Sequence, residues 1–151
     1  MDLGIAGKKA FVCASSRGLG LACATSLARE GCQVFINGRD REALEAAADT
    51  IQAAAGRRPE IVVADLNTEE GRAKIVAACP EPDIFVGTCS PPPMTPDHRA
   101  IKPADWQAAL DTGLMSPVQI IEAVLPGMVR RRWGRIVNIA SVAGLGPTGS
   151  S

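Results

Sequence analysis

The 151-residue chain contains no tyrosine, only one histidine, and aromatic side chains at just 3% of its positions. It has no excess of either charge, because sixteen Lys and Arg residues balance sixteen Asp and Glu residues. A protein dedicated to nucleic acid or to an anionic membrane surface usually carries a basic excess. No apolar run approaches the roughly 18 residues that span a bilayer, and no basic, apolar leader follows Met1. We therefore expect a cytoplasmic protein that binds neither nucleic acid nor membrane.

Signatures of metal binding and of disulfide bonding are absent as well. The five cysteines are widely spaced and odd in number, and none belongs to a Cys-x-x-Cys pair. This spacing matches neither a zinc site nor a disulfide framework, and the apolar surroundings favour buried, reduced thiols. The single histidine, His98, lies between Asp97 and Arg99 without a neighbouring set of ligands. We expect no metal site.

The remaining composition, 46% hydrophobic and 21% charged residues, is typical of a folded globular domain. Short apolar runs that predict buried strands alternate with helical patterns, while residues 90–96 hold four prolines and cannot form regular structure. The expected strands are 8–14, 32–37, 60–64, 83–87 and 134–140, and the expected helices are 19–29, 41–55, 69–78, 103–111 and 116–131. This alternation predicts one α/β domain over residues 1–151, with a parallel sheet covered by helices on both faces.

The turn after the first expected strand has the composition of a phosphate-binding loop. Gly18 and Gly20 would let the backbone approach a pyrophosphate closely. The helix that follows offers unpaired N–H groups and a positive dipole at its N-terminus. Two glycines also occur in ordinary strand–helix turns, so this feature alone does not establish a nucleotide site.

The end of the second expected strand indicates which dinucleotide would bind. NAD sites usually carry an acidic residue there, which holds the ribose 2′-hydroxyl. This strand ends instead in Asn37-Gly38-Arg39. Arg39 can pair with a 2′-phosphate, and Arg17 can reach the same group. The favoured cofactor is therefore NADP, with NAD less favoured, and the alternative is that both arginines are ordinary surface residues.

The segments 14–39, 64–66, 83–86 and 133–141 together resemble the short-chain dehydrogenase/reductase family, and within it the 3-oxoacyl-(acyl-carrier-protein) reductase-like members. The resemblance runs over essentially the whole chain. It implies a Rossmann-like, doubly wound parallel sheet, here of about five strands in the order 3-2-1-4-5. It also implies hydride transfer between NADP and a small carbonyl or alcohol substrate, and a homo-oligomer in which the helix at 116–131 packs against a second subunit.

The resemblance assigns roles to individual residues. Those that match the phosphate loop of the family are Ser16, Arg17, Gly18, Leu19 and Gly20. Asp65 and Leu66 match the pair that contacts the adenine, and Ser141 matches the catalytic serine that hydrogen-bonds the substrate carbonyl. Thr88 stands at the central cofactor contact, where the family has Asn-Asn-Ala-Gly and this chain has Gly87-Thr88-Cys89-Ser90.

Several positions depart from the family pattern. Cys13-Ala14 replaces Thr-Gly at the start of the phosphate loop, and Gly113 stands near the asparagine of the catalytic set. The Tyr-x-x-x-Lys motif would begin just beyond Ser151, so we expect a domain that lacks the C-terminal part of the family fold. Losing a positioned general acid costs about 10²–10⁴ in rate. We expect this chain to be weakly active or inactive, with a non-catalytic dinucleotide-binding module as the alternative, and its open sheet edge to favour self-association.

Overall fold

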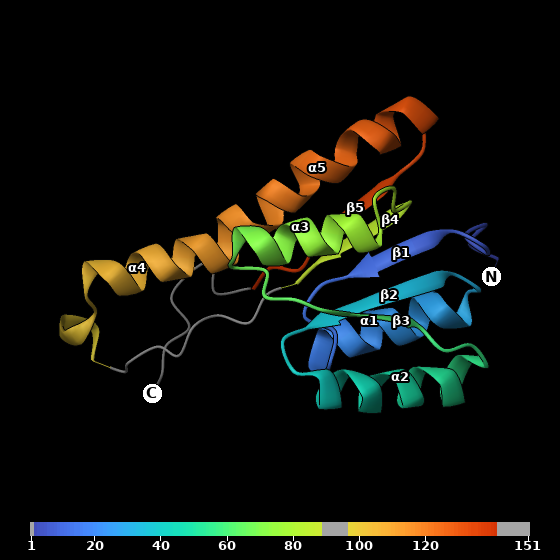
Figure 1. Cartoon of the computed structure of the whole chain (residues 1–151), viewed down its shortest axis with the longest axis horizontal. Coiled ribbons are helices and arrows are strands. Elements are labelled where there is room, and N and C mark those ends of the chain that lie inside the picture. The colour runs from blue at the N-terminus through green and yellow to red at the C-terminus, as the bar shows by residue number, and fades with distance from the viewer. Residues whose placement is uncertain (1, 89–96, 142–151) are drawn as a thin grey trace.

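A computed structural model describes residues 2–88 and 97–141 of the chain (Figure 1). Strands and helices alternate along the described residues, as the sequence predicted. The strands are β1 (Lys9–Val12), β2 (Gln33–Gly38), β3 (Glu60–Val63), β4 (Ile84–Gly87) and β5 (Arg135–Asn138). The helices are α1 (Gly18–Arg29), α2 (Arg41–Ala55), α3 (Glu69–Ala78), α4 (Pro103–Leu110) and α5 (Ser116–Arg131), with a 3-10 turn η1 (His98–Ala100) and a π-helical turn η2 (Asp111–Met115). Cys89, Ser90 and the proline-rich segment 90–96 lie outside the described residues.

The strands form one five-stranded parallel sheet in the order β3-β2-β1-β4-β5. This confirms the predicted doubly wound arrangement and its strand order. Helices α1 and α2 cover one face of the sheet, and α3 and α5 cover the other (Figure 1). Because all the strands are parallel, their carboxyl ends meet at one edge, which is where ligands bind in open α/β sheets.

Alternating side chains along each strand supply the two apolar cores. Phe11, Phe35 and Phe85 point to the face that α3 and α5 cover, and the Phe11 and Phe85 rings stack with their centroids 6.5 Å apart. Their sequence neighbours Val12 and Ile36 point to the opposite face, toward α1 and α2. Strands that are buried on both faces read as continuous apolar runs, which explains why the sequence identified them.

The predicted helix ends of α2 and α3 are confirmed in detail. The Asp40 side chain accepts hydrogen bonds from the backbone N–H groups of Glu42 (2.9 Å) and Ala43 (3.2 Å) at the start of α2. Gly56 ends that helix in the left-handed conformation, with φ of 75°. The Thr68 hydroxyl accepts from the Gly71 N–H (3.0 Å) at the start of α3.

The two helices expected at 103–111 and 116–131 are continuous through η2, which differs from the predicted gap. The Ser116 hydroxyl donates to the Asp111 carbonyl (2.7 Å) across this turn, so a side chain supports the wider π-helical ring. By length and composition alone, the segment Pro103–Arg131 would suffice to cross a membrane, with a mean hydropathy of 1.2. Such a test is also passed by core helices of proteins that are not in membranes, and α5 packs on the sheet through Ile120, Val124 and Met128.

Candidate functional site

The turn between β1 and α1 has the tight geometry that a phosphate loop requires. Ala14 and Gly18 both adopt the left-handed backbone region, with φ of 43° and 58°. A Cβ at Gly20 would collide with the Ala14 carbonyl oxygen, so only glycine lets α1 pack this closely against the end of β1. The predicted phosphate-loop glycines therefore shape a turn that brings the start of α1 to the carboxyl edge of the sheet.

The first turn of α1 differs from that of the two helices next to it in the chain. Asp40 caps α2 and Thr68 caps α3, but no side chain caps α1, and its first turn contains no acidic residue. The backbone N–H groups of this turn thus have no capping side chain, and the helix dipole places partial positive charge there. Ser16 is half-buried, whereas Arg17 and Leu19 are exposed at this end of the helix.

The end of β2 presents a cation without a neighbouring carboxylate that is free to compete for it. Arg39 is exposed, and no ion pair or side-chain hydrogen bond links Arg39 or Arg17 to another residue in the described part of the chain. The carboxylate that follows Arg39 in the sequence, Asp40, is engaged in capping α2. An uncommitted guanidinium in this position suits an anionic ligand better than a ribose hydroxyl.

The predicted adenine-contacting pair lies in a turn held by several contacts just after β3. Asp65 and Leu66 are both half-buried. The Asp65 side chain accepts a hydrogen bond from the Asn67 N–H (3.0 Å), and the Leu66 carbonyl accepts one from the Arg72 guanidinium (2.9 Å). A Cβ at Gly71 would collide with the Asp65 carbonyl, so α3 begins directly against this turn.

Thr88 and Ser141 follow the ends of the neighbouring strands β4 and β5. Thr88 is half-buried and Ser141 is exposed. The Ile139 N–H donates to the Gly87 carbonyl (2.8 Å), which extends the pairing of the two strands beyond β5. Gly113, in η2, is exposed, and a Cβ there would meet no atom within 4 Å. Whichever side chain the family has at this position, the turn itself leaves space for one.

Sequence reasoning missed two buried polar residues behind these turns and one beside Gly87. Ser15 and Asn37 are fully buried, and the Asn37 N–H donates to the Ser15 hydroxyl (2.9 Å). The Asn138 side chain occupies the space where a Cβ of Gly87 would stand. A polar residue inside an otherwise apolar strand, as in Val-Phe-Ile-Asn, is the signal that could have identified Asn37.

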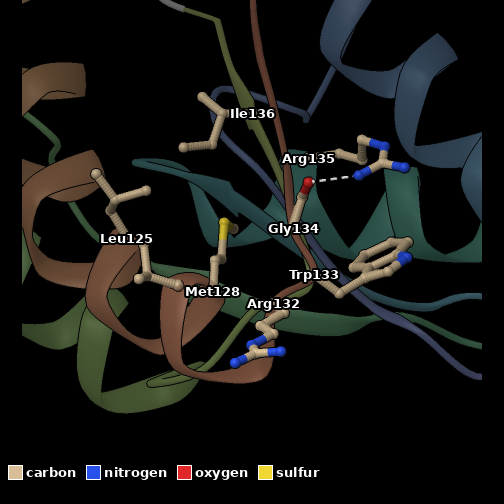
Figure 2. Close-up of a pocket in the computed structure, with 8 residues that line it drawn as sticks. Leu125, Met128, Arg132, Trp133, Gly134, Arg135 and Ile136 are labelled. Carbon is tan, nitrogen blue, oxygen red and sulfur yellow. Dashed lines mark hydrogen bonds between the residues drawn. The ribbon is translucent and has the colours of Figure 1, made fainter.

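A hollow of about 340 Å³ lies at the opposite end of the sheet, between the C-terminal end of α5 and the start of β5. Figure 2 shows Met128 and Trp133 among its lining residues. The Trp133 ring is flanked by the Lys8 ammonium, 4.4 Å from its centroid, and the Arg135 guanidinium, 4.9 Å away. Because this hollow faces the amino ends of the strands, it is separate from the turns described above.

The basic cluster beside this hollow is partly neutralised by acidic residues before β4. Arg130 pairs with Glu81 (2.8 Å), and Arg131 pairs with Glu81 (3.4 Å) and Asp83 (3.7 Å). Among the described residues, no group of His, Cys, Asp and Glu side chains is arranged to hold a metal ion. The described cysteines are free thiols, with Cys13, Cys32 and Cys79 buried and Cys23 half-buried.

Comparisons with known proteins agree with this arrangement. The profile of the short chain dehydrogenase family matches residues 8–150. An uncharacterized oxidoreductase of Bacillus subtilis, YvaG, is 34% identical over 98% of this chain and 56% of its own length. The 3-oxoacyl-[acyl-carrier-protein] reductase FabG of Aquifex aeolicus is 33% identical over 95% of this chain and 59% of its own length. The chain thus spans a little over half the length of these relatives.

Solved structures of the same kind superimpose closely on the sheet and its helices. The L-sorbose reductase of Gluconobacter frateurii, in complex with NADPH and L-sorbose, has a TM-score of 0.84 at 31% identity, over 96% of this chain and 56% of its own. A metagenomic short-chain oxidoreductase in complex with NADP has a TM-score of 0.79 at 31% identity, over 96% of this chain and 67% of its own. The chain belongs to the short chain dehydrogenase family.

Proposed function

We propose that this chain binds NADP(H) at the carboxyl edge of its sheet and supplies the dinucleotide-binding part of a cytoplasmic oxidoreductase. Hydride transfer would run between the nicotinamide and the carbonyl or alcohol carbon of a small molecule, as in 3-oxoacyl reductases. Two similar structures were solved with NADPH or NADP, which supports a nicotinamide dinucleotide as the ligand. The preference for NADP over NAD rests on the residues of this chain.

The observation that carries the proposal is the uncommitted Arg39 at the end of β2, beside an α1 that no side chain caps. In this arrangement the first turn of α1 would bind the pyrophosphate through backbone N–H groups. Arg39, assisted by Arg17, would hold the 2′-phosphate by charge-assisted hydrogen bonds. Asp65 and Leu66 would contact the adenine, and Thr88 would lie at the centre of the bound dinucleotide.

In the reaction, Ser141 would donate a hydrogen bond to the substrate carbonyl oxygen. A serine hydroxyl is far too weak an acid to supply the proton near neutral pH, and the 151 residues contain no tyrosine. We therefore propose that these residues by themselves give weak turnover or none. The second candidate function, a dinucleotide-binding module without catalysis, is favoured by the same observation together with the bare Gly113.

The cofactor proposal is tested by the substitution Arg39→Asp. Removing the cation and adding a carboxylate should raise the dissociation constant for NADPH at least tenfold, about 1.4 kcal/mol, while NADH binding stays equal or improves. Arg57→Asp makes the same charge change at an exposed residue between α2 and β3, away from the carboxyl edge, and serves as the control. An NADPH affinity that Arg39→Asp leaves unchanged would refute the role of Arg39.

Hydride transfer is tested on a form of the protein that carries the Tyr-x-x-x-Lys motif downstream of Ser151. This form should oxidise NADPH in the presence of a 3-oxoacyl thioester or a simple carbonyl compound, and Ser141→Ala should abolish most of that activity. NADPH binding without any oxidation across such substrates would support the non-catalytic module instead.

A further inference from the structure

We propose that Asn37 is a positioning residue that sets the distance between the two turns that grip the dinucleotide. This inference rests on the proposed function, because it concerns how tightly the same site binds its ligand. Asn37 lies near the carboxyl end of β2 and is completely buried. Its hydrogen bonds reach the strand on either side of β2, toward the phosphate loop in one direction and the adenine-side turn in the other.

On the side of β1, Asn37 is joined to Ser15, the residue just before the predicted phosphate-loop residue Ser16. The Ser15 N–H donates to the Asn37 carbonyl (2.8 Å), and the Asn37 N–H donates back to the Ser15 hydroxyl (2.9 Å). The Ser15 hydroxyl in turn donates to the Val12 carbonyl at the end of β1 (2.8 Å). These bonds hold the start of the loop against β2 through a residue that has no contact with solvent.

On the side of β3, the Asn37 side-chain amide donates to the carbonyls of Val62 (3.0 Å) and Ala64 (3.1 Å). Both partners are carbonyl oxygens, so the atom that faces them must be the amide nitrogen. Ala64 directly precedes Asp65, the first residue of the adenine-contacting pair. A single side chain therefore spans the end of β3 and fixes where the Asp65 turn begins.

The Asn37 amide oxygen is buried and has no hydrogen-bond partner among the described residues. A buried acceptor without a partner is unfavourable, so a position with only a packing role would be better served by an apolar side chain of the same shape. That an amide stands here indicates that its two N–H donors are needed. Their partners both belong to the segment that leads into the Asp65 turn.

The main test compares dinucleotide binding in Asn37→Leu, which keeps the shape of the side chain but removes both donors. Its dissociation constants for NADPH and for NADH should each rise at least fivefold and by the same factor, because the spacing of the turns affects both ligands. Arg39→Asp, in contrast, should weaken NADPH alone. Val34→Ala, at the buried opposite end of β2, is the control for general loss of stability and should leave both constants within twofold.

A conservative variant and a ligand-free measurement complete the design. Asn37→Thr retains one hydroxyl donor, so its dissociation constants should fall between those of the wild type and Asn37→Leu; it also replaces Asn37→Leu if that variant fails to fold. Without ligand, hydrogen exchange of the Asn67, Thr68 and Gly71 amides, all bonded within the turn, should be faster in the Asn37 variants than in Val34→Ala.

The possible outcomes separate this inference from the proposed function. If the wild type binds both dinucleotides and Asn37→Leu binds them equally well, the positioning role is wrong and the proposed function stands. If Val34→Ala weakens binding as much as Asn37→Leu, the effect reflects stability and the inference is also wrong. If the wild type binds neither dinucleotide, the proposed function is wrong, and unchanged hydrogen exchange in the turn would overturn the positioning role as well.

Discussion

At the scale of single residues, Ala14 carries a conformational cost that its position imposes. Its φ of 43° lies in the left-handed region, where a Cβ costs roughly 1–2 kcal/mol. Ala14→Gly should therefore raise the free energy of unfolding, by up to about 1 kcal/mol once the greater chain entropy of glycine is deducted. The reverse change, Gly18→Ala at φ of 58°, should lower it by a similar amount, since a Cβ there meets strain but no clash. Urea unfolding measures both, and shifts of the same sign would contradict the account.

Cys79 gives a prediction about pH. Burial raises the pKa of its thiol to about 11, from 9.0 in the unfolded chain, so the folded protein keeps this thiol protonated where the unfolded chain loses the proton. The resulting stabilisation is fully present below about pH 9 and is lost as the pH rises toward 11. Between these values, wild-type stability should fall more steeply than that of Cys79→Ala, as thermal unfolding at a series of pH values would show. Equal slopes would contradict the burial of this thiol.

The residues that the sequence identified differ from those it missed in one physical respect. Gly18, Gly20 and Arg39 are recognisable because their residue type is required by backbone geometry or by ligand charge. Ser15 and Asn37 act through hydrogen bonds to backbone atoms of strands far away in the sequence. Those partners exist only once the strand order is known, so no local pattern reveals them.

At the scale of elements, the helix N-terminal turns separate capped from uncapped helices in agreement with the sequence, whereas η2 was not predicted. A Gly-containing stretch between two helical patterns reads as a break, because glycine weakens helices. Ser116, which is buried, bridges back to the Asp111 carbonyl and lets the helix continue. Tertiary burial of one side chain thus overrides a local preference.

Two glycines in helical segments should respond oppositely to alanine. Gly113→Ala should raise the free energy of unfolding by about 0.5–1 kcal/mol, because glycine is a poor helix former and the space beside it is open. Gly71→Ala should destabilise the protein strongly, since its Cβ would collide with the Asp65 carbonyl. Denaturant titrations of the two variants test the placement of η2 and α3. A destabilising Gly113→Ala would mean that the π-helical turn is packed against another surface.

At the scale of the whole molecule, the sheet order followed from the alternation of strands and helices and from the family resemblance. The surfaces that the fold leaves uncovered did not. The segment Pro103–Arg131 keeps large apolar side chains exposed over much of its length, and Val137 is half-exposed on β5, which pairs only with β4 among the described strands. The exposed residues on the long helix are Trp106 (59%), Leu110 (51%), Leu114 (53%), Met115 (42%), Leu125 (42%) and Val129 (66%).

Exposed apolar residues in a row along one helix predict self-association. We expect the chain to form dimers or larger oligomers, and Leu114→Lys should shift its mass toward the monomer by placing a charge within that row. Leu3→Lys, an exposed apolar residue near the N-terminus, should leave the mass unchanged. Light scattering coupled to size exclusion would report both. A wild-type chain that is monomeric at high concentration would contradict this expectation.

The most direct test of the account is a titration of the 151-residue chain with NADPH and, separately, with NADH, followed by the fluorescence of the reduced nicotinamide. The exposed Arg39 and the uncapped first turn of α1 predict saturable binding of NADPH, with an affinity at least tenfold higher than that for NADH. No saturable binding of NADPH, or equal affinities for the two dinucleotides, would contradict the central claim that this edge of the sheet holds NADP(H).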